Sequence, residues 1–90
     1  MDTILEVAEW MLEELKREKY LHQEQVVYDI ETKFGGEFTY INEYGNPAID
    51  KRVLQVFRNL TEYSVVWESG EKLWRFREDH DPPGRDADAY

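Results

Sequence analysis

Apolar residues alternate with polar ones on both sides of Gly70-Glu71, and this pattern limits the possible folds more than any other. A β-hairpin over residues 64–78, with a two-residue type II′ turn at Gly70-Glu71, places four large side chains on one face. A turn at Ser69-Gly70 would scatter them over both faces. The cross-strand pairs in the favoured register are Val65 with Phe76 and Trp67 with Trp74. The chain therefore needs other elements that cover the apolar face of a ribbon.

Apolar residues at helical spacing predict a first helix near the N-terminus and a second helix after a short link. Thr3 caps the first helix, and Glu6 completes a capping box. Tyr20-Leu21 forms the link. The second helix covers Gln23 to Phe34 and ends at Gly35-Gly36, because glycine readily adopts the left-handed conformation after a helix. The buried stripe expected in the first helix is Ile4, Ala8, Met11, Leu12 and Leu15, widened by Leu5 and Val7.

A short strand and a third helix follow the two glycines. Glu37 to Ile41 alternates as a strand does, and Asn42 to Asn46 has turn chemistry. The third helix begins at Asn46-Pro47, with Asp50 as the alternative N-cap, and ends near Thr61. Its expected buried positions are Ile49, Val53, Val56, Phe57 and Leu60.

This order of elements predicts an α+β fold of three helices with a C-terminal β-hairpin. It resembles the winged-helix variant of helix-turn-helix over residues 3–78, with Tyr20-Leu21 as a short first strand. One departure is the extra short strand between helices 2 and 3, where helix-turn-helix units have a turn of about three or four residues. We expect a winged-helix-like domain over residues 1–78. Residues 79–90 contain too little apolar surface to offset ordering entropy, which predicts a disordered acidic tail.

Three short segments also resemble a set of small uncharacterised bacterial and mobile-element proteins. That resemblance implies no known activity. The segments are Phe38-Thr39-Tyr40-Ile41-Asn42, Gly45-Asn46-Pro47-Ala48-Ile49-Asp50-Lys51, and Val65-Val66-Trp67 with Glu71-Lys72-Leu73-Trp74-Arg75.

Composition excludes several classes of protein. The 90 residues contain no cysteine, which excludes disulfides and cysteine-ligated zinc. No apolar run approaches the roughly 20 residues that span a bilayer, and the N-terminus lacks the basic segment of a signal peptide, so we expect a cytoplasmic protein. His22 and His80 are the only histidines, and the serines lie in hairpin positions. We therefore expect no enzyme, no catalytic or metal site, and no cofactor.

The net charge of −9 is unevenly distributed. Residues 51–77 hold six basic and three acidic side chains, whereas both flanking regions are acidic. In a winged helix the third helix and the hairpin contact DNA, so this distribution predicts a nucleic-acid-binding surface. Arg75 faces away from the tryptophans and is the exposed candidate in the hairpin. The predicted contact residues are Lys51, Arg52, Gln55, Arg58, Lys72, Arg75 and Arg77.

An alternative function is protein–protein interaction, as a homodimer or as a binder of a basic partner. Trp10 lies on the polar side of the first helix, and an exposed tryptophan is typical of an interface. Its ring is instead structural if the hairpin or the tail of its own chain covers it. A variant of this hypothesis has the carboxylates of the first helix imitate the phosphates of nucleic acid. The aspartates of the tail could also shield Arg75 and Arg77 from DNA.

Overall fold

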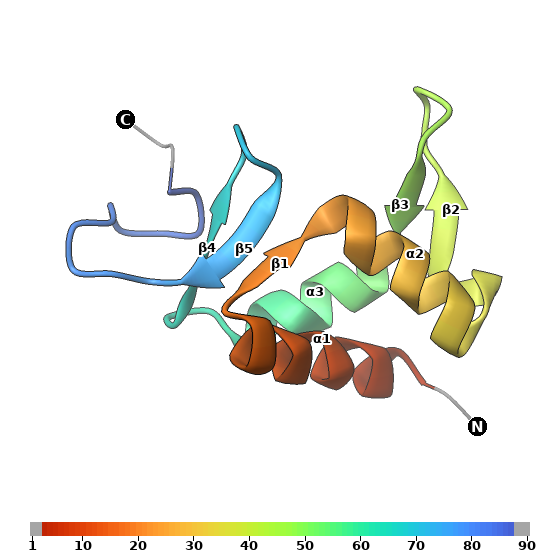
Figure 1. Cartoon of the computed structure of the whole chain (residues 1–90), viewed down its shortest axis with the longest axis horizontal. Helices are drawn as coiled ribbons and strands as arrows, with labels where there is room; N and C mark the ends of the chain where they lie inside the picture. Colours follow the sequence, from red (N-terminus) through yellow and green to blue (C-terminus); the bar gives the residue numbers. More distant parts are fainter. Residues whose placement is uncertain (1–2, 88–90) are drawn as a thin grey trace.

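The computed structural model describes residues 3–87 and has an α+β fold of three helices and two small antiparallel sheets. Helices α1 and α3 lie side by side, a three-stranded sheet lies beyond one end of this pair, and α2 lies towards the other end with a separate two-stranded sheet (Figure 1). Within residues 3–87, no helix is both long and apolar enough to cross a membrane. The elements are α1 (Ile4–Glu18), β1 (Tyr20–His22), α2 (Gln23–Phe34), β2 (Thr39–Ile41), β3 (Pro47–Ile49), α3 (Lys51–Leu60), β4 (Val65–Glu68) and β5 (Leu73–Phe76).

The two N-terminal helices confirm the predicted caps and most of the predicted stripe. Thr3 is the N-cap of α1, and its side-chain oxygen accepts a hydrogen bond from the Glu6 amide at 3.1 Å. Gly35, with φ of 97°, ends α2 as predicted. Leu5 departs from the prediction, since it is 49% exposed. The buried side chains of α1 are Val7, Ala8, Met11 and Leu15.

The C-terminal hairpin has the predicted register but a different turn. Trp67 pairs with Trp74, and β1 pairs with the other edge of β5 to give the order β1-β5-β4. The two-residue type II′ turn is wrong, because the strands end earlier and residues 69–72 form a four-residue turn. A type II′ turn needs a positive φ at Gly70, whereas the residue with positive φ in this turn is Lys72, at 54°. The turn is longer than predicted by one residue on each side, so the strand residues keep the predicted partners.

The segment between α2 and α3 forms a hairpin of two strands, β2 and β3, rather than one strand followed by a helix. The predicted helix start at Asn46-Pro47 is wrong, and Asp50 is the N-cap, accepting from the Arg52 amide at 2.7 Å. Asn42 closes the turn, because its Oδ1 accepts from the amides of Tyr44 and Asn46 at 2.9 and 3.0 Å. Pro47 follows this turn as the first residue of β3. Glu37 lies in a 3-10 turn, Gly36–Phe38, before β2 begins.

The core lies between α1, α2, α3 and the three-stranded sheet. Val53 and Phe57 are the buried residues of α3, and Ile49 is buried from β3 instead of from the helix. Leu60 was expected inside but is 42% exposed at the C-terminal end of α3. Phe57 contacts Trp74 edge to face, with ring centroids 5.6 Å apart, and so joins α3 to the sheet.

The segment predicted as a detached tail follows the outer edge of β4 over the part that the structure describes, residues 79–87. The Trp67 amide donates to the Arg85 carbonyl at 2.7 Å, and the Ala87 amide donates to the Trp67 carbonyl at 2.8 Å. These bonds form a short parallel bridge between Trp67 and Asp86. Backbone pairing of this kind needs little apolar surface, which is why composition did not reveal it. Residues 88–90, the end of the predicted tail, lie outside the described residues.

Candidate functional site

The predicted nucleic-acid residues of α3 share one exposed face. Lys51, Arg52, Gln55 and Arg58 are all exposed, opposite the buried side chains of the helix, and α3 itself contains no acidic residue. Arg52 forms an ion pair with Asp50 at 2.8 Å, and its side-chain hydrogen bonds are the main reason why the pKa of Asp50 is lowered. Gln55 donates to Asn59 at 3.0 Å. The side chains of Lys51 and Arg58 form no ion pair or hydrogen bond within residues 3–87, so they remain available to a ligand.

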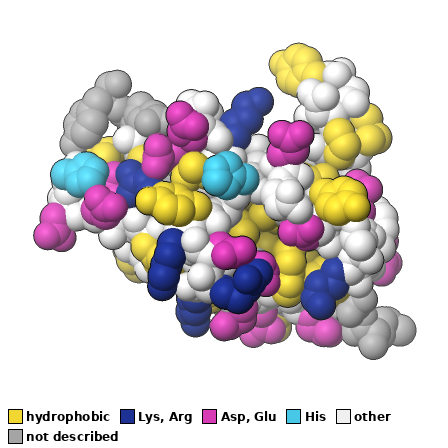
Figure 2. Space-filling model, in the orientation of Figure 1, with side chains coloured by type: hydrophobic (Ala, Val, Ile, Leu, Met, Phe, Trp, Pro, Cys, Tyr) yellow, Lys and Arg dark blue, Asp and Glu magenta, His cyan; other side chains and the backbone are white. Residues whose placement is uncertain are grey.

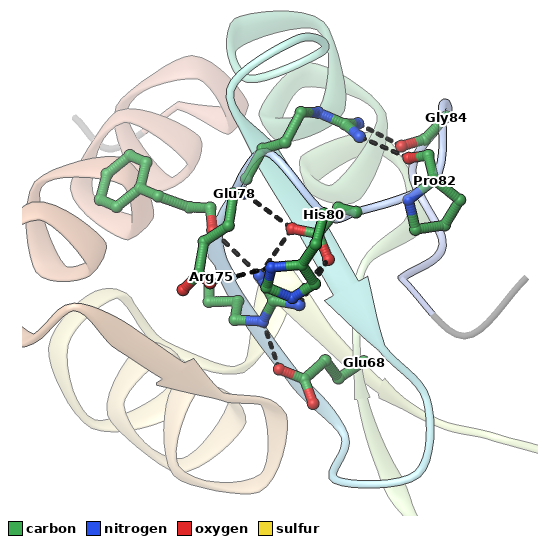
Figure 3. A network of polar contacts seen from close by, with 9 residues as sticks. Glu68, Arg75, Glu78, His80, Pro82 and Gly84 are labelled. Carbon is green, nitrogen blue, oxygen red and sulfur yellow. Dashed lines mark hydrogen bonds and ion pairs between the residues drawn. The ribbon is translucent and has the colours of Figure 1, made fainter.

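Arg75, by contrast, is engaged inside the molecule. Its side chain is only 13% exposed, so the expectation of an exposed Arg75 is wrong. The guanidinium donates from Nη1 and Nη2 to the two carboxylate oxygens of Asp81, at 2.8 and 2.7 Å, and from Nε to Glu68 (Figure 3). The hydrogen bonds from Arg75 and from the Glu78 amide hold the pKa of Asp81 well below its usual range. Arg75 therefore fastens the C-terminal segment to the hairpin.

Arg77 also points toward the C-terminal segment. Its guanidinium donates to three backbone carbonyls: to Tyr63 at 3.3 Å, to Pro82 at 2.7 Å, and to Gly84. Figure 3 shows the last two bonds between the hairpin and the returning chain. Of the hairpin residues predicted to contact nucleic acid, only Lys72 is exposed, in the four-residue turn. Arg75 and Arg77 are thus engaged within the molecule, whereas the other five predicted residues are exposed.

Arg85 is a residue that sequence analysis missed. Its Nη1 donates to the carbonyl and hydroxyl oxygens of Thr61, at 3.2 and 2.9 Å, and to the Val65 carbonyl at 3.1 Å. Its guanidinium lies over the ring of Phe57, 5.4 Å from the centroid. Burial lowers the pKa of Arg85 to about 10, and the positive charges of Arg58 and Arg77 add to this effect. A single arginine in an acidic, Pro/Gly-containing segment gave no local signal of these contacts.

Trp10 packs within its own chain. Its ring meets that of Phe34 edge to face, with centroids 5.7 Å apart and planes 75° apart, and it lies partly buried against the core. The covering element is thus α2, whereas sequence analysis had named the hairpin and the tail as alternatives to an interface.

The β2–β3 hairpin, which connects α2 to α3, carries three exposed large apolar side chains. Tyr40, Ile41 and Tyr44 are 39%, 66% and 80% exposed, respectively. The base of the hairpin is anchored, because Phe38 and Ala48 are buried and the Thr39 hydroxyl donates to Glu31 of α2 at 3.1 Å. Figure 2 shows hydrophobic side chains on this projecting part of the surface. The sequence did not reveal this hairpin, because Pro47 was predicted to begin the third helix and is instead the first residue of β3.

In the described part of the chain, the histidines do not form a metal site with the acidic residues. Residues 3–87 contain no group of three or more histidine, aspartate or glutamate side chains that could hold a metal ion. His80 lies 3.4 Å from Glu78, and both side chains are exposed.

Comparison with known proteins places the chain in a family. The sequence matches the profile of DUF6953, a family of unknown function, over residues 3–76. The chain belongs to this family. No curated protein and no solved structure matches it.

The range shared with DUF6953 runs from the cap of α1 to the end of β5. Both surfaces described above, the exposed face of α3 and the β2–β3 hairpin, lie inside this range. Arg77, Asp81 and Arg85 lie beyond it. The contacts that fasten the C-terminal segment thus combine Arg75, within the matched range, with residues outside it.

Proposed function

We propose that this chain is a protein-interaction module without enzymatic activity, and that it forms a homodimer through the β2–β3 hairpin. The observation that carries the proposal is the exposure of Tyr40, Ile41 and Tyr44 on an anchored hairpin that projects from the body of the fold. Tyrosine is enriched at the energetically important positions of protein interfaces. An isolated two-stranded ribbon is also only marginally stable in water, so covering its apolar side chains stabilises it.

The charge distribution favours a second copy of the chain as the partner. The net charge is −9, which opposes association between most parts of two molecules. The hairpin is an exception, since residues 39–49 contain one acidic residue, Glu43, and no basic residue. Two hairpins can therefore meet around a twofold axis with little repulsion, each presenting the same side chains to the other.

A double variant, Ile41→Ser with Tyr44→Ser, tests this proposal. We expect the native chain to show a mass that rises toward the dimer mass between two concentrations in light scattering, and the variant to stay at the monomer mass. Both side chains are exposed, so the substitutions should change the free energy of unfolding by no more than about 0.5 kcal/mol each. Tyr28→Ser is the matched control, because Tyr28 is 66% exposed on α2. A native chain that is monomeric at both concentrations, or a control that dissociates equally, contradicts the proposal.

A second candidate function is nucleic-acid association through α3, and the basic, acid-free exposed face of this helix favours it. The element order of a winged helix adds support, since β1 joins the C-terminal hairpin at one edge. Arg75 and Arg77 are poor candidates for contacts with nucleic acid, because both guanidinium groups already donate hydrogen bonds within the chain. The remaining contact residues are Lys51, Arg52, Gln55, Arg58 and Lys72.

Titration with mixed-sequence duplex DNA tests this second function. Binding through α3 should weaken as salt rises, and Lys51→Gln should reduce the slope of log affinity against log salt by about one. Lys16→Gln is the control, since Lys16 lies on α1 and pairs with Glu13. An affinity without salt dependence, or an equal effect of both variants, excludes the α3 face as the binding site.

A further inference from the structure

Three arginines from separate parts of the chain line one hollow beside the C-terminal hairpin. Arg58 comes from the last turn of α3, Arg77 follows β5, and Arg85 belongs to the C-terminal segment. The hollow has a volume of about 900 Å³, which is within the range of small-molecule sites. Tyr63 and Phe76 add aromatic surface to its wall.

None of these three arginines forms an ion pair within residues 3–87. The other three arginines of the chain, Arg17, Arg52 and Arg75, all pair with carboxylates. Carboxylates are not scarce, since the chain has 20 acidic and 11 basic residues. The unpaired guanidinium groups are therefore gathered at one place in an acidic protein.

The positive charges of Arg58 and Arg77 act on the guanidinium of Arg85. The positive charges of Arg58 and Arg77 add to the effect of burial in lowering the pKa of Arg85 to about 10. A guanidinium ordinarily keeps its proton in proteins, and although burial is the larger cause of this shift, the repulsion shows that the charges of Arg58 and Arg77 reach Arg85. An anion placed among them would remove this repulsion and gain charge-assisted hydrogen bonds.

Two of the arginines are already fixed in position. Backbone carbonyls hold Arg77, and Thr61 and Val65 hold one nitrogen of Arg85. The Nε and Nη2 groups of Arg85 have no hydrogen-bond partner in the described part of the chain, and neither has the side chain of Arg58. A ligand thus finds oriented donors and needs to order only Arg58, which lowers the entropic cost of binding.

Four acidic side chains also line the hollow and limit the size of the anion: Glu62, Glu78, Asp79 and Asp81. Asp81 is occupied by Arg75, and Glu78 lies 3.4 Å from His80. Glu62 and Asp79 are exposed, and neither lies in ion-pair contact with the three arginines. These carboxylates repel a long polyanion that lies across the hollow, whereas a small anion can enter between the guanidinium groups.

We propose that this hollow binds a small phosphate-bearing anion, either free phosphate or a phosphate monoester, between Arg58 and Arg85. The proposal is independent of the hairpin homodimer, which uses another part of the surface. A monoester with a flat substituent would place it against the exposed ring of Tyr63.

Amide chemical shifts of the full chain provide the test, with inorganic phosphate and phenyl phosphate as the two ligands and sodium chloride at equal ionic strength as the reference. Both phosphates should give saturable shifts at the amides of Tyr63, Ser64 and Arg85. Tighter binding of phenyl phosphate identifies a monoester as the better ligand, and equal affinities identify the free anion. Shifts that fail to saturate with either phosphate, or that sodium chloride reproduces, overturn the proposal.

The variant Arg58→Gln makes the test specific. Arg58 is exposed and has no partner in residues 3–87, so its replacement should leave the fold intact. We expect this variant to bind phosphate about tenfold or more weakly, the effect of losing a charge-assisted hydrogen bond. Arg17→Gln changes the net charge equally on α1 and should leave the affinity unchanged. Equal weakening by both variants would show that only the overall charge matters, and would overturn the site.

Discussion

Replacing Arg75 with methionine is expected to lower the free energy of unfolding by about 1–3 kcal/mol, the cost of leaving a covered polar group without its hydrogen-bond partner. Methionine keeps an unbranched apolar chain but removes the charge, so Asp81, whose side chain is 2% exposed, loses its cation. Glu68 is 27% exposed and regains some solvation, which limits the loss. Urea denaturation at pH 7 measures the change, and thermal unfolding should shift by on the order of 10 °C.

The loss of stability in Arg75→Met should depend on pH, because the carboxylate of Asp81 titrates. The pKa of Asp81 is lower in the folded chain than its ordinary value, because Arg75 donates two hydrogen bonds to its charged form. Such a group stabilises the fold above its unfolded pKa of about 4, and the contribution is lost as the pH falls toward the folded pKa. The difference between the native chain and Arg75→Met should therefore be full at pH 7 and shrink below about pH 4. An equal difference at pH 7 and at pH 3 would contradict the assignment to this pair.

Arg52→Met is the matched control. Arg52 also pairs with an aspartate, but its side chain is 71% exposed and its charge remains solvated. An exposed ion pair contributes little to stability, so the control should unfold close to the native midpoint. If both variants lose the same stability, burial of Arg75 is not the cause.

Much of the fold could be predicted because its signals are local. The alternation of Val65 and Trp67 with Trp74 and Phe76 fixed the register, since a shift by one residue moves every apolar side chain to the other face. The bounds of α2 likewise followed from its periodicity and from Gly35 at its end. These features depend on neighbours within a few residues, which a sequence displays directly.

The β2–β3 hairpin could not be derived in this way. Asn46-Pro47 is compatible with a helix start and with the entry to a strand, so local preference does not decide between them. The decision comes from tertiary contacts: the Asp50 amide donates to the Phe38 carbonyl at 2.9 Å, and Ala48 and Ile49 are buried. No pattern within residues 42–50 displays those partners.

The candidate site was only partly predictable for a similar reason. Periodicity correctly placed Lys51, Arg52, Gln55 and Arg58 on one exposed face, because a helical wheel depends only on the helix. It could not reveal that Arg75 is paired with Asp81, or that Arg85 reaches Thr61, 24 residues away. Whether a charged side chain is free or engaged is a property of the folded chain.

Replacing Phe57 with alanine is expected to lower the free energy of unfolding by about 3–5 kcal/mol, the range for large-to-small changes at aromatic core positions. Phe57 is fully buried, and its ring contacts Trp74 of β5 on one side and the guanidinium of Arg85 on another. Its loss removes the contact between α3 and the sheet and leaves a cavity. Small domains have a margin of about 5–15 kcal/mol, so the variant should unfold at much lower urea concentration than the native chain.

Phe57→Leu separates the two contacts of this ring, because leucine retains most of the apolar volume and should preserve the fold. Leucine has no aromatic face for Arg85, so the C-terminal segment should open more often while the core remains closed. Hydrogen exchange detects this at the Ala87 amide, which donates to the Trp67 carbonyl, and the Glu6 amide at the cap of α1 serves as the reference. We expect faster exchange at Ala87 with little change at Glu6. Equal acceleration at both amides would mean that Phe57 stabilises the fold as a whole and has no separate role in holding residues 79–87.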